Sequence, residues 1–244
     1  MKIVGIIPAR YASTRFPGKP LIDINGKSMI QRVYEQVLLS KNLNDVIVAT
    51  DDKRIEEHVI SFGGKVCLTS NLHNSGTERC NEVIHKLKDY NIDIVINIQG
   101  DEPFIDPKQI NALSDCFENE ETQIATLKKR IINSSELFDS NVVKVITDVN
   151  DKAIYFSRLP IPFLRGIANE LWVQNNIHFK HIGIYAYRIT VLNEIIKLPF
   201  SNLEKFESLE QLRWIENGYK ITVKETDIES ISIDTPEDIK KIVF

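Results

Sequence analysis

The chain has 244 residues, of which 43% are hydrophobic and 26% are charged, and both fractions are ordinary for a soluble globular protein. Its 30 Lys and Arg residues against 34 Asp and Glu residues give a net charge of -4, which excludes an overall basic field for nucleic acid. The length suits one large α/β domain rather than two small ones.

Cysteine usage and hydrophobicity set further limits. The three cysteines, Cys67, Cys80 and Cys116, are scattered without a CxxC pair, which argues against a zinc site and a disulfide framework. The first apolar run is too short for a signal peptide, and no stretch reaches the roughly 18 apolar residues of a membrane span. We therefore expect a cytoplasmic protein with no membrane or nucleic-acid partner.

The first half of the chain alternates strand and helix signals. Apolar runs predict strands at 3–7, 46–50, 65–68 and 94–98. Capping signals and apolar periodicity predict helices at 28–40, 53–62, 75–89 and from 106 onward. This alternation predicts an α/β fold with a doubly wound, mostly parallel sheet.

The pattern changes after about residue 123. Strands are predicted at 124–128, 142–147, 153–157, 182–187, 221–224 and 231–233, and helices at 190–198, 203–216 and from 235. A hairpin turn is predicted at 148–151, and a loop rich in Pro and Gly at 160–166. We interpret residues 1–244 as a single domain with an inserted sub-region in its second half.

The loop that follows the first strand carries an unusual set of side chains. Arg10, Arg15 and Lys19 supply positive charge, Ser13 supplies a hydroxyl, and Gly18 permits close backbone approach. The alternative interpretation is a solvated surface turn, but three cations around one Pro-Gly pair argue against it. The loop matches neither a Walker A motif nor a G-x-G-x-x-G fingerprint. It predicts a polyanion site of another kind.

Two carboxylates follow apolar segments that end at the same edge of the predicted sheet. Asp101 follows the strand at 94–98, and Asp234 follows 231–233. Ligands of such sheets bind outside the carboxyl ends of the strands, and Mg²⁺ takes one or two carboxylates together with phosphate oxygens. Asp234 could instead serve the following helix, but Thr235 is the better N-cap. The pair predicts a magnesium site.

Seven strings in order resemble the family of bacterial sugar cytidylyltransferases, and within it the 3-deoxy-manno-octulosonate (Kdo) cytidylyltransferases. They are PAR..STR.PGKPL at 8–21, GTER at 76–79, QGDEP at 99–103, YFSR at 155–158, HIGIY at 181–185, LEQLR at 209–213 and DTPED at 234–238. The resemblance runs from about residue 2 to 240 and departs only in the 160–180 loop.

The resemblance implies a nucleotide-diphospho-sugar transferase fold, a homodimer, and the reaction of CTP with Kdo to give CMP-Kdo and diphosphate for lipopolysaccharide synthesis. It implies that residues 124–230 carry the sugar-binding and dimerisation sub-region. Mg²⁺ would be held by Asp101 and Asp234. The nucleotide would be bound by Pro8, Ala9, Arg10, Ser13, Arg15, Lys19, Thr77, Arg79 and Gln99. The acidic sugar would be bound by Arg158, His181, Tyr185, Glu210 and Gln211. Arg10, Lys19, Asp101 and Asp234 would be the catalytic residues.

Several of these residues have a second interpretation from the sequence. Arg79 could be a surface residue of a first helical turn, and His181 and Tyr185 could be core residues. Glu210 and Gln211 lie in a predicted helix, where a solvated face is the ordinary environment.

Other functions stay open beside this one. The acceptor could be another acidic sugar, such as 8-amino-Kdo or a sialic-acid-like sugar. A GT-A-like glycosyltransferase would also bind a nucleotide and a metal, but it usually carries an Asp-x-Asp motif, which is absent after the strand at 94–98. A non-catalytic nucleotide sensor would bind CTP without turnover.

Overall fold

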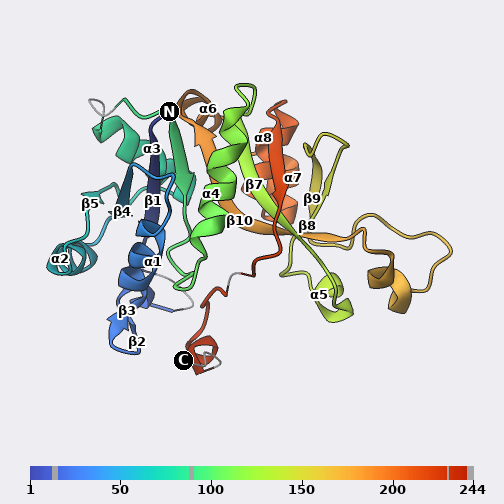
Figure 1. Cartoon of the computed structure of the whole chain (residues 1–244), viewed down its shortest axis with the longest axis horizontal. Coiled ribbons are helices and arrows are strands. Elements are labelled where there is room, and N and C mark those ends of the chain that lie inside the picture. The colour runs from blue at the N-terminus through green and yellow to red at the C-terminus, as the bar shows by residue number, and fades with distance from the viewer. Residues whose placement is uncertain (13–15, 88–90, 230, 241–244) are drawn as a thin grey trace. The chain divides into compact units, whose positions relative to one another are not determined.

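The computed structural model describes residues 1–12, 16–87, 91–229 and 231–240 (Figure 1). The chain divides into two compact units, the first from residues 1–114 and 230–244 and the second from residues 115–229. The expectation of a single domain with a sub-region at about 124–230 stays a prediction. No helix within these described stretches is both long enough and apolar enough to cross a membrane.

The first unit contains a parallel sheet in the order β6-β1-β4-β5. Its strands are β1 (Ile3–Ala9), β4 (Asp45–Thr50), β5 (Val66–Leu68) and β6 (Ile94–Asn97). The apolar residues of β1, β4 and β6 are buried, as in a sheet covered on both faces. All four strands were expected from their apolar runs, and the parallel α/β interpretation is confirmed.

The helices of the first unit begin where the sequence predicts. They are α1 (Met29–Leu38), α2 (Lys53–Ser61), α3 (Gly76–Lys86), α4 (Pro107–Asp115) and α9 (Pro236–Lys240). The Ser28 and Ser75 hydroxyls accept N–H bonds of 3.2 Å from the third residue of α1 and α3, which satisfies donors that the helix leaves unpaired. Glu78 does not complete the box on Ser75, because its carboxylate accepts from the N–H of Asn74 at 2.7 Å.

A small hairpin, β2 (Asp23–Ile24) and β3 (Lys27–Ser28), was not expected. Its turn residues Asn25 and Gly26 have φ of 52° and 80°. Positive φ at both positions is the geometry for which Asn-Gly is the strongest short-range signal. The signal was therefore present in the sequence.

The second unit is built on antiparallel pairs with one parallel neighbour. Its strands are β7 (Ile124–Arg130), β8 (Lys144–Thr147), β9 (Ala153–Ser157), β10 (Phe179–Arg188) and β11 (Ile221–Glu225). β10 pairs antiparallel with β7 and β8, β8 pairs antiparallel with β9, and β11 runs parallel to β7. The register of β10 on β7 shifts between Ile182 and Tyr185, which marks a β-bulge.

The helices of the second unit are short. They are α5 (Ser134–Phe138), α6 (Ile189–Ile195), α7 (Asn202–Glu207) and α8 (Glu210–Glu216), and 3-10 helices lie at Cys116–Glu118 and Asn169–Asn175. Ser201 and Glu204 form a reciprocal capping box at the start of α7. The turn predicted at 148–151 is confirmed, because the Asp148 carboxylate accepts from the N–H groups of Asn150 and Lys152 at 2.8 Å.

Two predicted elements were wrong. The helix expected at 203–216 is two helices, because Ser208 adopts the left-handed conformation with φ of 53° between α7 and α8. Residues 231–233 form no strand, and Ile233 instead donates one backbone hydrogen bond of 2.9 Å to the Asp101 carbonyl. The alternation of apolar and polar residues at 231–233 reflects the burial of Ile233 and not pairing of these residues in a sheet.

Candidate active site

The loop after β1 begins at the carboxyl edge of the first unit's sheet. Ala9 lies beside Thr50 in the parallel register, so the loop starts where β4 also ends. The Gly18 N–H donates to the Tyr11 carbonyl at 2.9 Å, and Gly18 has φ of 74°. A Cβ on Gly18 would lie 3.3 Å from the Tyr11 ring. The positive φ therefore favours glycine here, and the Tyr11 ring leaves little room for a side chain.

The predicted phosphate-binding side chains are placed in part. Arg10 is exposed, and its guanidinium donates to the backbone carbonyl of His73. Ser13 and Arg15 lie outside the described residues. The Arg54 guanidinium stacks 3.3 Å above the Tyr11 ring, which adds a cation near the loop that the sequence did not single out.

Lys19 joins the two predicted metal carboxylates. Its ammonium donates to Asp101 Oδ2 at 2.8 Å and to Asp234 Oδ1 at 3.3 Å. The Lys19 side chain is 12% exposed, whereas those of Asp101 and Asp234 are 30% and 41% exposed. We call these three residues the lysine–aspartate cluster. The backbone bond from Ile233 to Asp101 holds the two aspartate-bearing segments together.

The lysine–aspartate cluster fits a divalent cation. Two carboxylate oxygens already converge on one cationic nitrogen, and Mg²⁺ needs one or two carboxylates, with phosphate oxygens and water completing its shell. In the part of the chain that the structure describes, no three or more His, Cys, Asp or Glu side chains lie together in a way that could hold a metal ion. The metal role of Asp101 and Asp234 stays a prediction.

Glycines bring the ends of β1 and β6 close together. A Cβ on Gly100 would lie 2.6 Å from the Pro8 carbonyl oxygen, closer than such atoms approach. A Cβ on Gly76 would lie 3.3 Å from both the Pro8 ring and the Asn97 amide. Because Gly100 stands between Gln99 and Asp101, this contact sets where both predicted site residues leave the sheet.

Arg79 is placed differently from the other predicted nucleotide ligands. Its side chain is fully buried in α3, where it donates to the Thr69 hydroxyl and lies 3.4 Å from Asp51 Oδ2. Burial lowers the pKa of Arg79, and the Asp51 charge opposes that shift. Thr77 is also buried. Contact of Arg79 with a nucleotide would require a covering group to move, so its binding role stays a prediction.

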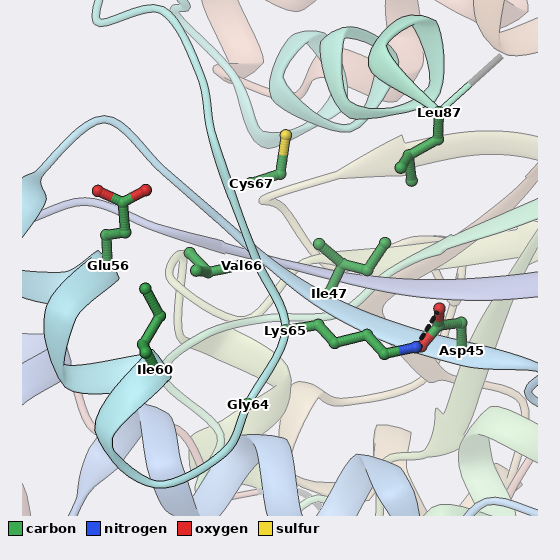
Figure 2. A pocket seen from close by; sticks show the side chains of 9 residues that line it. All are labelled: Asp45, Ile47, Glu56, Ile60, Gly64, Lys65, Val66, Cys67 and Leu87. Carbon is green, nitrogen blue, oxygen red and sulfur yellow. Dashed lines mark hydrogen bonds and ion pairs between the residues drawn. The ribbon is translucent and has the colours of Figure 1, made fainter.

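A pocket in the first unit lies apart from these residues. It has a volume of about 460 Å³ and lies between α2, β4 and β5 (Figure 2). Its wall includes Ile47, Ile60, Val66 and Cys67, and a Lys65–Asp45 ion pair of 2.8 Å crosses one side. None of the predicted site residues lines it, so we do not assign the reaction to it.

In the second unit the predicted sugar ligands His181 and Tyr185 lie on β10 on either side of the bulge. Their rings are 5.2 Å apart, Phe156 stands edge-on to His181 at 5.0 Å, and Trp214 stands edge-on to Tyr185 at 5.2 Å. The His181 ring lies 2.9 Å, through Nε2, from the hydroxyl of Thr126 on β7. We call these five residues the histidine–aromatic cluster.

Burial dominates the electrostatics of the histidine–aromatic cluster. It lowers the pKa of His181 to about 3, so the imidazole is neutral near pH 7. It also raises the pKa of Tyr185 well above its usual value, and the charge of Glu210 adds to that shift against a smaller effect of the Thr126 hydroxyl. His181 keeps partial solvent access, whereas Tyr185 is buried.

Arg158, expected to bind the sugar carboxylate, is held by backbone carbonyls. Its guanidinium donates to the carbonyls of Glu207 at 2.6 Å, Ser140 at 3.0 Å and Ser208 at 3.5 Å. The Glu207 carboxylate in turn accepts from the Arg158 N–H and the Ser157 hydroxyl, both at 2.9 Å. Arg158 and Glu207 therefore fix the junction between α7 and α8.

The junction positions the remaining sugar candidates. Glu210 lies in the first turn of α8 and pairs with the buried Arg213 at 3.0 Å, and Gln211 is buried. Arg213 also lies 3.4 Å from Glu204 and donates to the Leu198 carbonyl at 3.2 Å. The carboxylate of Glu210 thus has a fixed cationic partner, and a solvated helix face does not describe it.

The sequence did not reveal Thr126, Glu207 or Ser208. Thr126 looks like an ordinary strand threonine, and Glu207 lies within a predicted helix. One signal for the break was Ser208-Leu209-Glu210-Gln211, in which a serine three positions before a glutamine can mark a new helix start, although Leu209 is the residue that precedes α8.

Comparisons with known proteins identify the family of this chain. The sequence matches the family described as Cytidylyltransferase over residues 4–226. A 3-deoxy-manno-octulosonate cytidylyltransferase of Parabacteroides distasonis is 56% identical over 245 residues, which covers 99% of this chain and 96% of the relative. A protein of the same name from Bacteroides thetaiotaomicron is 56% identical, with 98% and 96% covered.

Solved structures share the fold. A structure of CMP:2-keto-3-deoxy-manno-octonic acid synthetase complexed with CTP superposes with a TM-score of 0.91 at 44% identity, covering 99% of this chain and 96% of that one. A 4-diphosphocytidyl-2C-methyl-D-erythritol synthase from Anaerococcus prevotii, at 14% identity and a TM-score of 0.60, is similar in fold alone. The α/β fold predicted from the sequence is thus that of nucleotidyltransferases.

Proposed function

Because this chain belongs to the cytidylyltransferase family, we propose that it transfers the cytidylyl group of CTP to the anomeric hydroxyl of Kdo. The products are CMP-Kdo and diphosphate. The observation that carries the proposal is the lysine–aspartate cluster beside the cationic loop after β1, since it combines phosphate-binding charge with metal-binding carboxylates. The Kdo-named relatives, at 56% identity over almost the whole chain, support the choice of sugar.

The chemistry is one in-line displacement at phosphorus. The anomeric oxygen of the sugar forms a bond to the α-phosphorus, and the bond from that phosphorus to the bridging β-phosphate oxygen breaks. Diphosphate leaves with the electron pair, and the proton of the anomeric hydroxyl passes to solvent. Such reactions depend on positioning and on charge stabilisation more than on covalent chemistry by the protein.

The first unit supplies the charge. Arg10 and Lys19 would bind the phosphates and take up negative charge on the leaving diphosphate, and Ser13 and Arg15 are proposed for the same task. Asp101 and Asp234 would hold Mg²⁺, to which their paired oxygens are suited. When bound, Mg²⁺ supplies charge stabilisation at the α-phosphate and lowers the pKa of the attacking hydroxyl. Lys19, which now pairs with both carboxylates, would then turn to the phosphates.

The second unit supplies the sugar ligands. Three of the five N–H groups of Arg158 go to backbone carbonyls, so the side chain is fixed and retains two donors for the sugar carboxylate. The histidine–aromatic cluster offers a shaped, largely apolar wall. Glu210, held by Arg213, and Gln211 would bind sugar hydroxyls.

The decisive experiment measures diphosphate release from CTP and Mg²⁺ with and without Kdo. We expect release that depends on Kdo, falls away with UTP or ATP, and stops on chelation of the metal. Release with 8-amino-Kdo or a sialic acid in place of Kdo would move the proposal to that acceptor. Binding of CTP without release on any acidic sugar would favour a nucleotide sensor instead.

Three further expectations belong to this proposal. CMP-Kdo is a precursor for lipopolysaccharide, so we place the reaction in that pathway and in the cytoplasm, consistent with three free thiols.

We also propose a homodimer formed through the second unit, where Leu159, Phe163 and Phe206 are 70%, 73% and 80% exposed. Sedimentation of the purified chain tests this, and a monomer at micromolar concentration would contradict it.

A further inference from the structure

The hydroxyl of Thr126 meets three polar groups at once, one of which is the His181 ring. Thr126 lies on β7 and is fully buried. Its Oγ1 is 2.9 Å from His181 Nε2, 2.8 Å from the Ile184 carbonyl and 3.1 Å from the Ile182 carbonyl. The bulge of β10 makes this possible, because it turns two carbonyls of one strand toward the same hydroxyl.

The proton count favours one arrangement. A threonine hydroxyl has one proton, and a carbonyl can only accept. If the proton went to His181 Nε2, both carbonyl oxygens would face a buried oxygen with no proton between them, which is costly. The Thr126 hydroxyl therefore donates to a carbonyl, and it accepts from an N–H at Nε2 of His181.

The environment of His181 keeps the ring in its neutral form. The rings of Phe156 and Tyr185 flank it, and burial is the cause of its strongly lowered pKa. Lys128 faces His181 across the strand pair, but its ammonium is engaged with Thr147 and Asp151 at 2.8 Å. A neutral ring with a proton on Nε2 has a lone pair on Nδ1, and within the described residues Nδ1 has no hydrogen-bond partner and is not among the buried unpartnered atoms.

We infer that Thr126 is a positioning residue that fixes His181 as the neutral Nε2–H tautomer, so that Nδ1 accepts a hydrogen bond from a hydroxyl of the sugar. The sugar half of this inference rests on the proposed function. Arg158 and His181 then have different tasks within the second unit. Arg158 binds the negatively charged carboxylate of the sugar, and His181 accepts a hydrogen bond from an uncharged hydroxyl. A cationic histidine in this place would instead compete for the carboxylate.

The tautomer can be measured without any substrate. In the free protein labelled with ¹⁵N-histidine, two-bond ¹H–¹⁵N spectra at pH 7 should give His181 a protonated Nε2 and an unprotonated Nδ1. Thr126→Ser should keep this pattern, and Thr126→Val, which removes the hydroxyl at constant shape, should lose it. A wild-type spectrum with the proton on Nδ1 would overturn the inference even if Thr126→Val fails to fold.

Kinetics test whether His181 accepts a hydrogen bond from the sugar. Thr126→Val should raise KM for Kdo about tenfold while KM for CTP stays unchanged, and Thr126→Ser should restore most of the loss. Thr122→Val, at a buried threonine of the same unit, controls for a general loss of packing. An unchanged KM for Kdo in a Thr126→Val enzyme with an altered tautomer would overturn the acceptor role. Absence of Kdo-dependent release in the wild type would reject the proposed function and leave the tautomer result standing.

Discussion

The two groups of predicted site residues differ in what fixes their geometry. In the first unit, Lys19, Asp101 and Asp234 are partly exposed and are held to one another by opposite charge. In the second unit, His181 and Tyr185 are packed among rings, and the His181 ring is also held by the buried hydroxyl of Thr126, which in turn contacts the Ile184 carbonyl. A site that must accept phosphate and metal can rely on mobile charges, whereas a site that must recognise one sugar needs fixed donors and acceptors.

The largest expected effect comes from removing one charge of the first group. We expect Asp101→Asn to lower kcat by about 10³-fold, because an amide cannot stabilise a bound cation beside the phosphates as a carboxylate does. The melting temperature should stay near that of the wild type, since Asp101 is partly exposed and its paired Lys19 can reach solvent or Asp234.

Asp227→Asn, at an exposed aspartate, is the matched control and should keep full activity. A large loss in both variants, or retention of most activity in Asp101→Asn, would remove Asp101 from the metal site. Charge would then not distinguish the site residues of the first unit from those of the second.

A steric change comes next. We expect Gly100→Ala to destabilise the fold by about 1–3 kcal/mol and to lower activity, because its Cβ would lie 2.6 Å from the Pro8 carbonyl oxygen and push Gln99 and Asp101 out of place. Thermal unfolding and diphosphate release measure the two effects.

Gly166→Ala makes the control, because its Cβ would meet open space and only its φ of 81° opposes alanine. That backbone cost is about 1 kcal/mol, and no loss of activity should accompany it. Equal effects of the two variants would show that close approach at Gly100 does not position the site.

The lysine–aspartate cluster was accessible to sequence reasoning for a physical reason. Charged residues in the loops that follow buried strands have few structural explanations, so Lys19 and Asp101 could be singled out, and the parallel sheet brings such strand ends to one edge. The parallel strands themselves were predicted because β1, β4 and β6 are continuous apolar runs.

The second unit resisted the same reasoning. The importance of Thr126 depends on a bulge that places two carbonyls beside it, and no local pattern encodes that bulge. The break at Ser208 is contacted by Arg158, a residue 50 positions away, which donates to its carbonyl at 3.5 Å. The burial of Gln211 likewise arises from packing of a short helix, whereas its place in a predicted helix suggested a solvated face.

The break at Ser208 gives a smaller effect that tests the second unit. We expect Ser208→Val to cost about 1–2 kcal/mol, because a β-branched residue is poorly suited to φ of 53°. Ser208→Gly should stay within about 1 kcal/mol of the wild type. Chemical denaturation measures both, and a raised KM for Kdo with unchanged KM for CTP should accompany Ser208→Val, since the junction positions Glu210.

The smallest effect is a dependence of stability on pH that comes from His181. Burial lowers its pKa in the folded protein to about 3, below the ordinary value of 6.5. The unfolded chain therefore binds a proton below about pH 6.5 that the folded chain does not bind until about pH 3. The stability contributed by the neutral ring is complete above pH 6.5 and is lost as the pH falls toward 3.

Denaturant unfolding at pH 7 and pH 5 should show this as a loss in the wild type that His181→Gln does not share. The difference should be smaller than the limit of about 1.4 kcal/mol per pH unit, because the ring keeps partial access to solvent. His85→Gln, at an exposed histidine, controls for the removal of one histidine. If His181→Gln and His85→Gln lose equal stability between the two pH values, the ring is not held neutral by burial, and the contrast between a charged first group and an uncharged second group fails.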